Sequence, residues 1–492
     1  MRRLAALLPL MTILAGCTAP TADLAPADEH GGAPEGVEVV SRTSAPPPNG
    51  TVSAEAAANP PPAAPPASLP PVRRVPFGVP VELPLVGGIG AGEPNIAALP
   101  DGTLFITSPT GLQSKPNAVE GAAYLWRSTD GGATWETLRG PDATMPVGPF
   151  CSCDADVIGA SDGTAYYSDW WDGNYLVESS TDGGETWSAA PVTTREAVPF
   201  TRVDRQWLVP GEGGSIGLFY SYFSQVGLPV PVPVTETTRG VHAVFSTDRG
   251  LTWGQPVVVV DHGVQISHPR TLPDGTLVMP YGEIETDPDL GYWRSPSRVM
   301  LAVSSDGGAT WAHMKVADAK HGFDNLWAVQ ADVDASGAIH VGWSARVDDD
   351  TMATYLSTSR DAGASWTTPL ALRSTGLNFL PWVAATDHGT VAVGWYGSDA
   401  TGDPVKAEDA TWYAYVGESR DGGETFAVHR VSEEPVKKGP LCPRGASCEG
   451  DRELLDYVSL VYDASGNLHY AYARSAGGIA QTLVATALAQ AD

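Results

Sequence analysis

Acidic, basic and aromatic residues recur in short clusters along this chain, in combinations that suit a sugar-binding site. The candidate ligand-binding residues are Glu93, Asn95, Trp170, Trp171, Arg205, His268, Arg270, Arg346, Arg452 and Asp456. Aromatic rings can stack on sugar faces, and arginine binds a carboxylate through two parallel hydrogen bonds. We expect these residues to form a ligand site together, although each alone also fits a structural, hydrogen-bonded lining.

Carboxylates near these clusters are candidates for catalysis. Asp154 or Asp156 with Asp204 would supply the two acids that hydrolyse a neutral glycan. The same three aspartates could instead hold calcium, which takes several oxygen ligands. No cofactor other than calcium is indicated, and the sequence contains neither a nucleotide-binding loop nor a histidine-based zinc pattern.

An eight-residue pattern repeats six times and defines the elements that position these residues. The copies are Ser128–Trp135, Ser180–Trp187, Ser246–Trp253, Ser304–Trp311, Ser359–Trp366 and Ser419–Phe426. Each reads as a tight turn, in which aspartate accepts backbone N–H groups, glycine supplies positive φ and the final aromatic residue anchors the turn. Self-similarity at about this spacing indicates a repeat fold.

A second turn, centred on glycine, alternates with the first and occurs seven times. Clear copies are Asp101–Leu104, Asp162–Thr164 and Asp274–Leu277, and weaker ones lie at Gly213, Gly337, Gly389 and Gly466. Alternating apolar stretches flank each turn, so every unit reads as four strands, A to D. The last unit lacks strand D, and an extra strand within 75–86 precedes the first. We predict an all-β propeller of seven four-stranded blades, closed by the N-terminal strand, with six blades as the alternative.

This topology predicts the location of the site. Both kinds of turn lie on one face, and the D–A and B–C loops lie on the other, around the central axis. The long, irregular loops are all of the second kind, and loops on a rigid scaffold often carry function. The candidate residues follow these loops, so we expect the site on the D–A face.

The repeated octet is the Asp-box, and the chain resembles the Asp-box (BNR repeat) propellers of the sialidase superfamily. Resemblance to sialidases would imply an arginine triad, a Tyr–Glu pair and an aspartate acid/base. The stretch that matches the first arginine motif reads Ala91-Gly92-Glu93-Pro94-Asn95-Ile96, with Gly92-Glu93 where the family has Arg-Ile. A glutamate there would repel a carboxylate, so sialidase activity is not expected. Under this resemblance, the triad could be rebuilt from Arg205, Arg270, Arg346 and Arg452, with Tyr281 and Glu283 as the catalytic pair of nucleophile and helper.

The N-terminus reads as an export signal. Two arginines, an apolar run and Leu14-Ala15-Gly16-Cys17 match a bacterial lipobox, which makes Cys17 the expected lipidation site and 1–17 the signal peptide. Residues 18–75 are rich in proline and alanine and are expected to form a disordered tether. Residues 76–492 form the propeller domain. We therefore expect an exported protein, lipid-anchored to the cell envelope and facing away from the cytoplasm.

The amino-acid composition excludes one class of partner. The net charge of −28 argues against a nucleic acid partner, because nucleic acids are polyanions. Four cysteines remain after Cys17 and allow three pairings, of which a bond between Cys442 and Cys448 is favoured by the short loop between them. The sequence thus leaves two hypotheses for a monomeric protein. One is a glycan-directed propeller that hydrolyses or binds a glycan, and the other is a non-catalytic scaffold that binds a protein or peptide.

Overall fold

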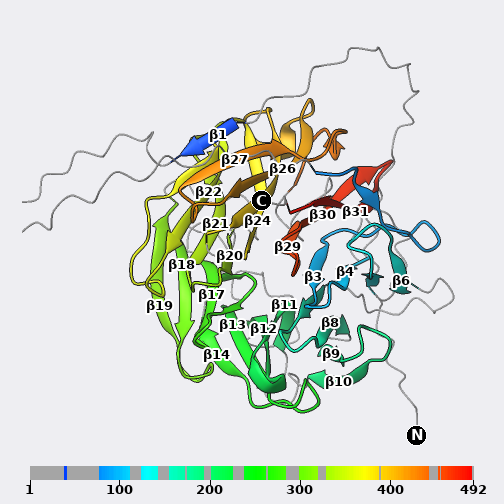
Figure 1. The fold of residues 1–492 in the computed structure, drawn as a ribbon. Helices are drawn as coiled ribbons and strands as arrows, with labels where there is room; N and C mark the ends of the chain where they lie inside the picture. Colours follow the sequence, from blue (N-terminus) through cyan, green and yellow to red (C-terminus); the bar gives the residue numbers. More distant parts are fainter. Residues whose placement is uncertain are drawn as a thin grey trace, which may run out of the picture. The chain divides into compact units, whose positions relative to one another are not determined.

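A computed structural model gives an all-β ring of seven blades, within the compact unit Val37–Asp492 (Figure 1). It describes residues 38–41, 77–110, 123–141, 154–171, 174–192, 201–224, 238–261, 264–283, 298–319, 329–386, 389–442, 453–454 and 456–489. Helical structure in these ranges is limited to short 3-10 turns, such as η2 (Glu212–Gly214) and η4 (Pro404–Lys406). The predicted fold class and blade number are therefore confirmed, and the six-bladed alternative is wrong.

Each blade is an antiparallel sheet that follows the predicted A–B–C–D order. Blade one is β3 (Asn95–Ala98), β4 (Leu104–Ser108), β5 (Tyr124–Ser128) and β6 (Glu136–Arg139); blade two is β7 (Ala155–Gly159), β8 (Ala165–Trp171), β9 (Asn174–Ser180) and β10 (Ser188–Val192). Blade three is β11 (Thr201–Pro210), β12 (Ile216–Ser224), β13 (Thr238–Ser246) and β14 (Val257–Val260). Blade four is β15 (Val264–Ile266) with β16 (Arg270–Thr271), β17 (Leu277–Glu283), β18 (Arg298–Ser304) and β19 (Ala312–Asp318).

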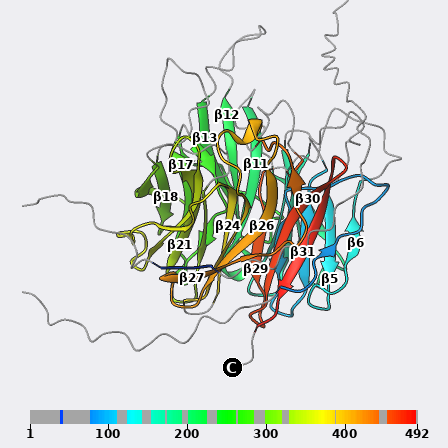
Figure 2. The same cartoon turned by 90° about the horizontal axis from the view of Figure 1, so that it is seen from above.

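The remaining three blades complete the ring. Blade five is β20 (Val329–Val333), β21 (Ile339–Arg346), β22 (Met352–Ser359) and β23 (Leu370–Arg373); blade six is β24 (Leu377–Ala385), β25 (Val391–Ser398), β26 (Thr411–Ser419) and β27 (Thr425–Arg430), with β28 (Lys437–Lys438) beside β26. Blade seven is β29 (Ser459–Tyr462), β30 (Leu468–Ala476), β31 (Ile479–Ala487) and β2 (Val81–Glu82). The strands of successive blades run alongside one another when the molecule is turned (Figure 2).

The N-terminal strand closes the ring, as predicted. Val81 and Glu82 of β2 pair with Val484 and Leu483 of β31, and Phe77 forms a bridge with Ala487. Blade seven therefore combines three strands from the C-terminal end of the domain with one from its start. This arrangement leaves no gap between the first and last blades, and it removes an exposed edge of β31.

The Asp-boxes are turns with nearly the same geometry in every copy. In the first, Asp130 Oδ1 accepts the Thr134 backbone N–H at 2.9 Å, and Asp130 Oδ2 accepts the Thr134 hydroxyl at 2.6 Å. The Ser128 hydroxyl accepts the Gly132 N–H at 2.9 Å, and the Trp135 indole donates to the Gly132 carbonyl at 3.1 Å. These hydrogen bonds hold the pKa of Asp130 at about 2. The aspartate is thus used by the turn itself.

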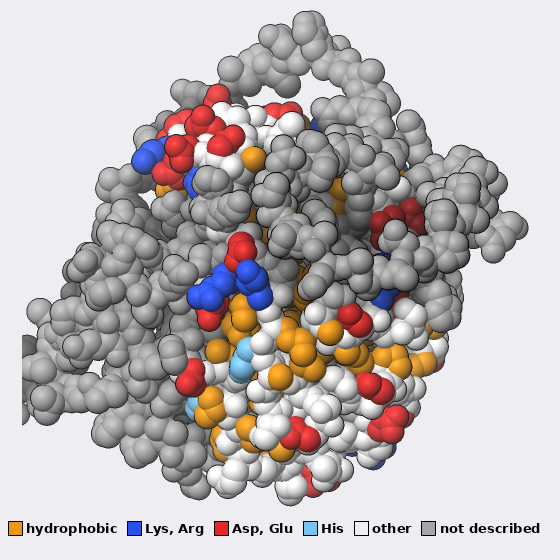
Figure 3. Space-filling model, turned by 90° about the vertical axis from the view of Figure 1, so that its left-hand side faces the viewer, with side chains coloured by type: hydrophobic (Ala, Val, Ile, Leu, Met, Phe, Trp, Pro, Cys, Tyr) orange, Lys and Arg blue, Asp and Glu red, His pale blue; other side chains and the backbone are white. Residues whose placement is uncertain are grey.

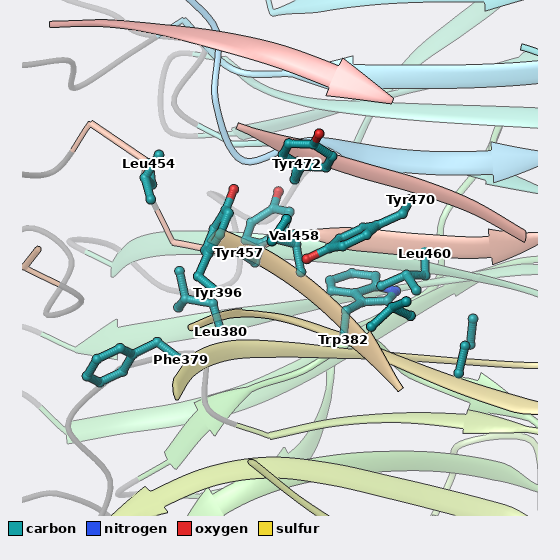
Figure 4. Packing of buried hydrophobic residues seen from close by; sticks show 14 of the residues in the cluster. Phe379, Leu380, Trp382, Tyr396, Leu454, Tyr457, Val458, Leu460, Tyr470 and Tyr472 are labelled. Carbon is teal, nitrogen blue, oxygen red and sulfur yellow. The ribbon is translucent and has the colours of Figure 1, made fainter. Parts of the chain in front are cut away.

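Apolar and aromatic side chains pack between neighbouring blades. Tyr396 of blade six and Ala473 of blade seven illustrate this, because the Tyr396 hydroxyl accepts the Ala473 N–H at 2.7 Å and donates to its carbonyl at 3.1 Å. Tyr470 donates to the Trp395 carbonyl across the same boundary. Figure 4 shows these rings with Trp382 and Tyr457 in the largest buried cluster. Hydroxyl groups at the boundaries therefore fix how the blades align.

One short segment of the predicted tether is ordered, contrary to expectation. Glu38–Ser41 forms strand β1, which pairs with β27 on the outer edge of blade six (Figure 1). Its sequence, EVVS, lacks proline and contains two β-branched residues, so it can accept the pairing that an exposed edge offers. Cys17 and the signal peptide lie outside the described residues. Within the described residues, no helix is long and apolar enough to cross a membrane.

Candidate functional site

Equivalent positions of the seven blades place one inward-facing side chain each on the axis. In the A–B turn of every blade, one backbone N–H donates to the carbonyl of the residue four positions later. The residues that carry this N–H are Leu99, Ala160, Gly211, Leu272, Asp334, Thr386 and Asp463. Four residues before these positions are Asn95, Asp156, Trp207, His268, Gln330, Trp382 and Ser459, and all seven are buried. We call this set the lower ring. It fills the axis with polar and aromatic groups.

Two residues earlier lies a second set, which we call the upper ring. Its described members are Glu93, Asp154, Arg205, Leu380 and Tyr457. Each A strand runs from the D–A loops toward the A–B turn, so the upper ring lies nearer the D–A face. Glu93, Arg205 and Leu380 have positive φ angles of 53°, 39° and 56°, a conformation that costs non-glycine residues free energy. Local strain at three blades thus accompanies the inward placement of these side chains.

Arg205 is the centre of the upper ring. Its guanidinium bonds to Glu93 Oε2 at 2.5 Å, to Asp154 Oδ1 at 2.7 Å and to the Tyr457 hydroxyl at 2.6 Å. Its backbone N–H donates to Asp154 Oδ2 at 3.1 Å, and its Cζ lies 4.6 Å from the centre of the Tyr457 ring. The side chain is 1% exposed. Arg205 therefore links blades one, two, three and seven with a buried cation between two carboxylates.

Asp156 is the centre of the lower ring, as Arg205 is of the upper ring. It accepts the Asn95 amide and the Leu208 backbone N–H, each at 2.6 Å, and its Oδ2 lies 3.5 Å from His268 Nε2. Its side chain is fully buried, and this burial raises its pKa to about 7, against the opposing effect of the Leu208 N–H. A protonated Asp156 can donate from Oδ2 toward His268. The contacts join blades one, two, three and four.

Aromatic side chains complete the interior of the ring. The Trp207 ring lies 5.0 Å from His268, 5.7 Å from Trp382 and 5.3 Å from Tyr457, measured between ring centroids. Trp382 and Tyr457 are stacked at 5.7 Å (labelled in Figure 4). The cluster resembles a protein core in packing, with charged groups above it. It forms a floor beneath the D–A face.

The structure brings together six of the predicted site residues and separates others. Glu93, Asn95, Asp154, Asp156, Arg205 and His268 lie in the two rings. Asp456, next to Tyr457, is also buried. Arg270 instead pairs with Asp332 at 2.6 Å, and Arg346 donates to the Asp349 carbonyl at 2.8 Å. Arg452 and the side chains of Asp204, Trp170 and Trp171 lie outside the described residues.

The Tyr281–Glu283 pair finds its partners within blade four. The Tyr281 hydroxyl lies 2.9 Å from His313 Nδ1 of β19, and Glu283 pairs with Arg298 of β18 at 2.7 Å. Burial and the nearby Glu283 carboxylate raise the pKa of Tyr281, which opposes its ionisation as a nucleophile. The described contacts of this pair therefore do not join it to the rings.

Sequence reasoning missed Trp207, Trp382 and Tyr457 as members of the site. Counting four or six residues back from each A–B turn would have found them, because the repeat fixes which residues face the axis. The described residues contain no group of three or more histidine, cysteine or acidic side chains placed to hold a metal ion. Cys442 is buried, and Cys448 lies outside the described residues, so their pairing stays a prediction.

Charged pairs also occur on the outer wall of the ring. Lys315 and Asp318 of β19 lie 3.0 Å apart, and both side chains are half exposed. Figure 3 shows basic side chains bordered by acidic ones on one lateral face, within a mixed polar and apolar surface. The buried charges on the axis are therefore distinct from ordinary surface pairs.

Comparisons with known proteins agree with this architecture. Residues 206–393 match the family model described as a BNR repeat-like domain. A sialidase of Micromonospora viridifaciens is 27% identical over 254 residues, which are 45% of this chain and 36% of the sialidase. The chain thus matches only about a third of the length of that relative.

Solved structures are similar at lower identity. An α-L-arabinofuranosidase of Fusarium graminearum is 15% identical, with a TM-score of 0.45 over 84% of this chain and 98% of the other. A protein of unknown function from Dyadobacter fermentans is 17% identical, with a TM-score of 0.44 over 74% of this chain and 100% of the other. The chain is thus a seven-bladed propeller with six Asp-boxes, it contains a BNR repeat-like domain, and part of it is similar to a sialidase.

Proposed function

We propose that this protein is a glycan-directed propeller whose ligand rests on the upper ring at the D–A face, and that it recognises neutral sugars rather than sialic acid. The observation that carries this proposal is the pairing of Arg205 with both Glu93 and Asp154. One guanidinium between two carboxylates leaves an excess of negative charge. The carboxylates of the upper ring can accept hydrogen bonds from sugar hydroxyls, and their negative charge repels the carboxylate of a ligand.

The arginines support the exclusion of sialic acid. Arg205 and Arg270 are each paired with carboxylates, and Arg346 binds a backbone carbonyl. A carboxylate-bearing sugar would have to displace Glu93 or Asp154 from a buried ion pair, which leaves an uncompensated buried charge. The similarity to a sialidase supports a carbohydrate ligand in general and does not specify which one.

Binding requires less of this site than hydrolysis. A glycosidase needs two carboxylates on either side of the scissile bond. Asp156 is fully buried and hydrogen-bonded, so it serves the lower ring. Asp154 is the more exposed acid, with a side chain 10% exposed, and would need a partner such as Asp204 for catalysis. We therefore propose ligand binding as the main role of Asp154, and hydrolysis as the alternative role.

A glycan array, with fluorogenic glycosides alongside it, tests the proposal. We expect binding to at least one neutral glycan and no release of sialic acid from a sialoside. Asp154→Asn should weaken binding about tenfold, because it removes a charged acceptor. Asp101→Asn is the matched control, since Asp101 caps an A–B turn on the opposite face and asparagine can still accept the Thr103 N–H. Failure to bind or cleave any sugar would overturn the proposal.

We further propose that the propeller is exported and anchored through a lipid on Cys17. The support is the lipobox sequence, and the acidic domain has no other expected affinity for a membrane. Cys17→Ser should move the protein from the membrane fraction to the soluble fraction, as measured by immunoblotting. Continued fractionation of the variant with membranes would contradict the anchor.

A further inference from the structure

Within the residues that the structure describes, the four-stranded blade six is extended at its outer edge by an additional strand, β1, from the segment before the propeller. Strand β1 pairs with β27 in an antiparallel register that joins Glu38 to Val428, Val40 to Phe426 and Ser41 to Thr425. β1 also contacts β23, the outer strand of blade five. The segment therefore lies along the boundary between two blades, about fifty residues from the propeller's first described A strand in sequence.

The Asp-box of blade six closes with phenylalanine, whereas the other five close with tryptophan. Trp135, Trp187, Trp311 and Trp366 each donate an indole N–H to a glycine carbonyl of their own turn at 3.1 Å. Phe426 lacks that donor, and β27 begins at Thr425, so that it includes the phenylalanine. In the other five Asp-box blades the outer strand begins after the tryptophan. Thr425 and Phe426 belong to β27 through their pairing with Ser41 and Val40, because the pairing of β27 with β26 begins only at Ala427.

Burial agrees with this difference. Phe426 is fully buried, whereas the four tryptophans are only partly buried. Val40 packs against the hydrophobic cluster that contains Phe426, Val428 and Leu372. An apolar side chain of β1 therefore covers a ring that would otherwise lie at the edge of the sheet. The contact combines backbone pairing with an apolar anchor, the two components of strand-addition binding.

We propose that the outer edge of blade six is a docking site for an extended apolar segment, and that residues 38–41 of this chain occupy it. The tether is then latched to the propeller at this edge. This site is distinct from the axial rings and does not depend on what they bind.

Hydrogen exchange of the full-length protein, followed by mass spectrometry, tests the docking. Val40→Asp places a charge against the apolar cluster and should release β1. We expect the backbone amides of Thr425–Arg430 to exchange about tenfold faster in this variant. Val258→Asp is the matched control, because Val258 is an exposed valine on β14, the outer strand of blade three. It should leave exchange in Thr425–Arg430 unchanged, and β26 should stay protected in both variants.

A labelled peptide with the sequence of residues 36–43 provides a second readout. Fluorescence anisotropy should show saturable binding of this peptide to the Val40→Asp protein. The wild-type protein should bind the peptide much more weakly, because its own residues 38–41 already occupy the edge. Light scattering distinguishes the source of the docked strand. A monomer with a protected β27 supports docking within one chain, and protection that is lost when a dimer is diluted would overturn it. Equal exchange of β27 in wild type and Val40→Asp would overturn the site itself.

Discussion

The Asp-box turns and the axial rings both use aspartate, yet they use it in opposite ways. Each Asp-box aspartate bonds to serine, threonine and backbone groups within four residues, at the outer part of a blade. Asp154 and Asp156 bond to side chains and backbone groups more than fifty residues away, at the buried axis. The first arrangement is local and repeated, and the second exists only when neighbouring blades have packed together.

This difference has energetic consequences. A turn aspartate remains hydrated and ionised, and its loss affects one turn. An axial carboxylate is desolvated, so its charge must be neutralised by a partner or by a proton. The rings should therefore tolerate substitution much less than the turns. Three variants make this comparison quantitative.

The largest effect is expected for Arg205→Met. This change leaves Glu93 and Asp154 as buried carboxylates without their cation, and should cost about 3–5 kcal/mol in the free energy of unfolding, measured with urea. Arg249→Met is the control, because Arg249 pairs with Asp162 at 3.2 Å with both side chains more than a third exposed. That pair should contribute less than about 1 kcal/mol. Equal losses in the two variants would remove the distinction between axis and surface.

The second effect concerns pH and Asp156. Because its pKa is raised to about 7 in the folded protein, the protonated carboxyl stabilises the fold fully below the unfolded value of 3.8. That contribution is lost as the pH rises through 7. Asp156→Asn cannot ionise, so the wild type should lose about 4 kcal/mol relative to the variant between pH 4 and pH 8. Urea unfolding across this range measures the difference, and a difference that does not change with pH would contradict the raised pKa.

The smallest effect is expected in an Asp-box. Asp421 accepts hydrogen bonds from Ser419, Glu424 and Thr425, and Asp421→Ala should cost about 1–2 kcal/mol. These hydrogen bonds outweigh its partial burial and lower its pKa, so its contribution is present above pH 3.8 and is lost as the pH falls through the folded value. Asp421→Asn should retain part of this stabilising contribution, because the asparagine side-chain oxygen can still accept hydrogen bonds. Thermal unfolding of both variants checks the order, and a loss from Asp421→Ala as large as that from Arg205→Met would contradict it.

The two regions also differ in how well the sequence predicts them. The Asp-boxes and the A–B turns follow from short patterns, because their hydrogen bonds join residues close in sequence. The closing strand is predicted from the missing fourth strand of the last unit and the extra strand before the first, although it pairs with β31 at the other end of the domain. Glu93, Asp154 and Arg205 could be assigned to the axis from their place before the A–B turns. Their pairing could not, since it depends on contacts between blades such as that of Arg205 with Tyr457, 252 residues apart.

The segment at Glu38–Ser41 shows a further limit of sequence reasoning. Its four residues are surrounded by proline- and alanine-rich sequence, which hides a short strand whose partner lies almost four hundred residues later. The one difference visible in the sequence at its partner strand is Phe426, which stands where the other Asp-boxes have tryptophan. Its meaning depends on which strand is at the edge of blade six, and only the assembled sheet provides that.

The central claim is that the buried cation on the axis is occupied by this protein's own carboxylates. Calorimetric titration of the full-length protein with sialic acid and with a neutral sugar selected on the array tests it most directly. We expect the neutral sugar to bind at least about tenfold more tightly, because Glu93 and Asp154 repel the carboxylate of sialic acid. Tighter binding of sialic acid than of any neutral sugar would contradict the account.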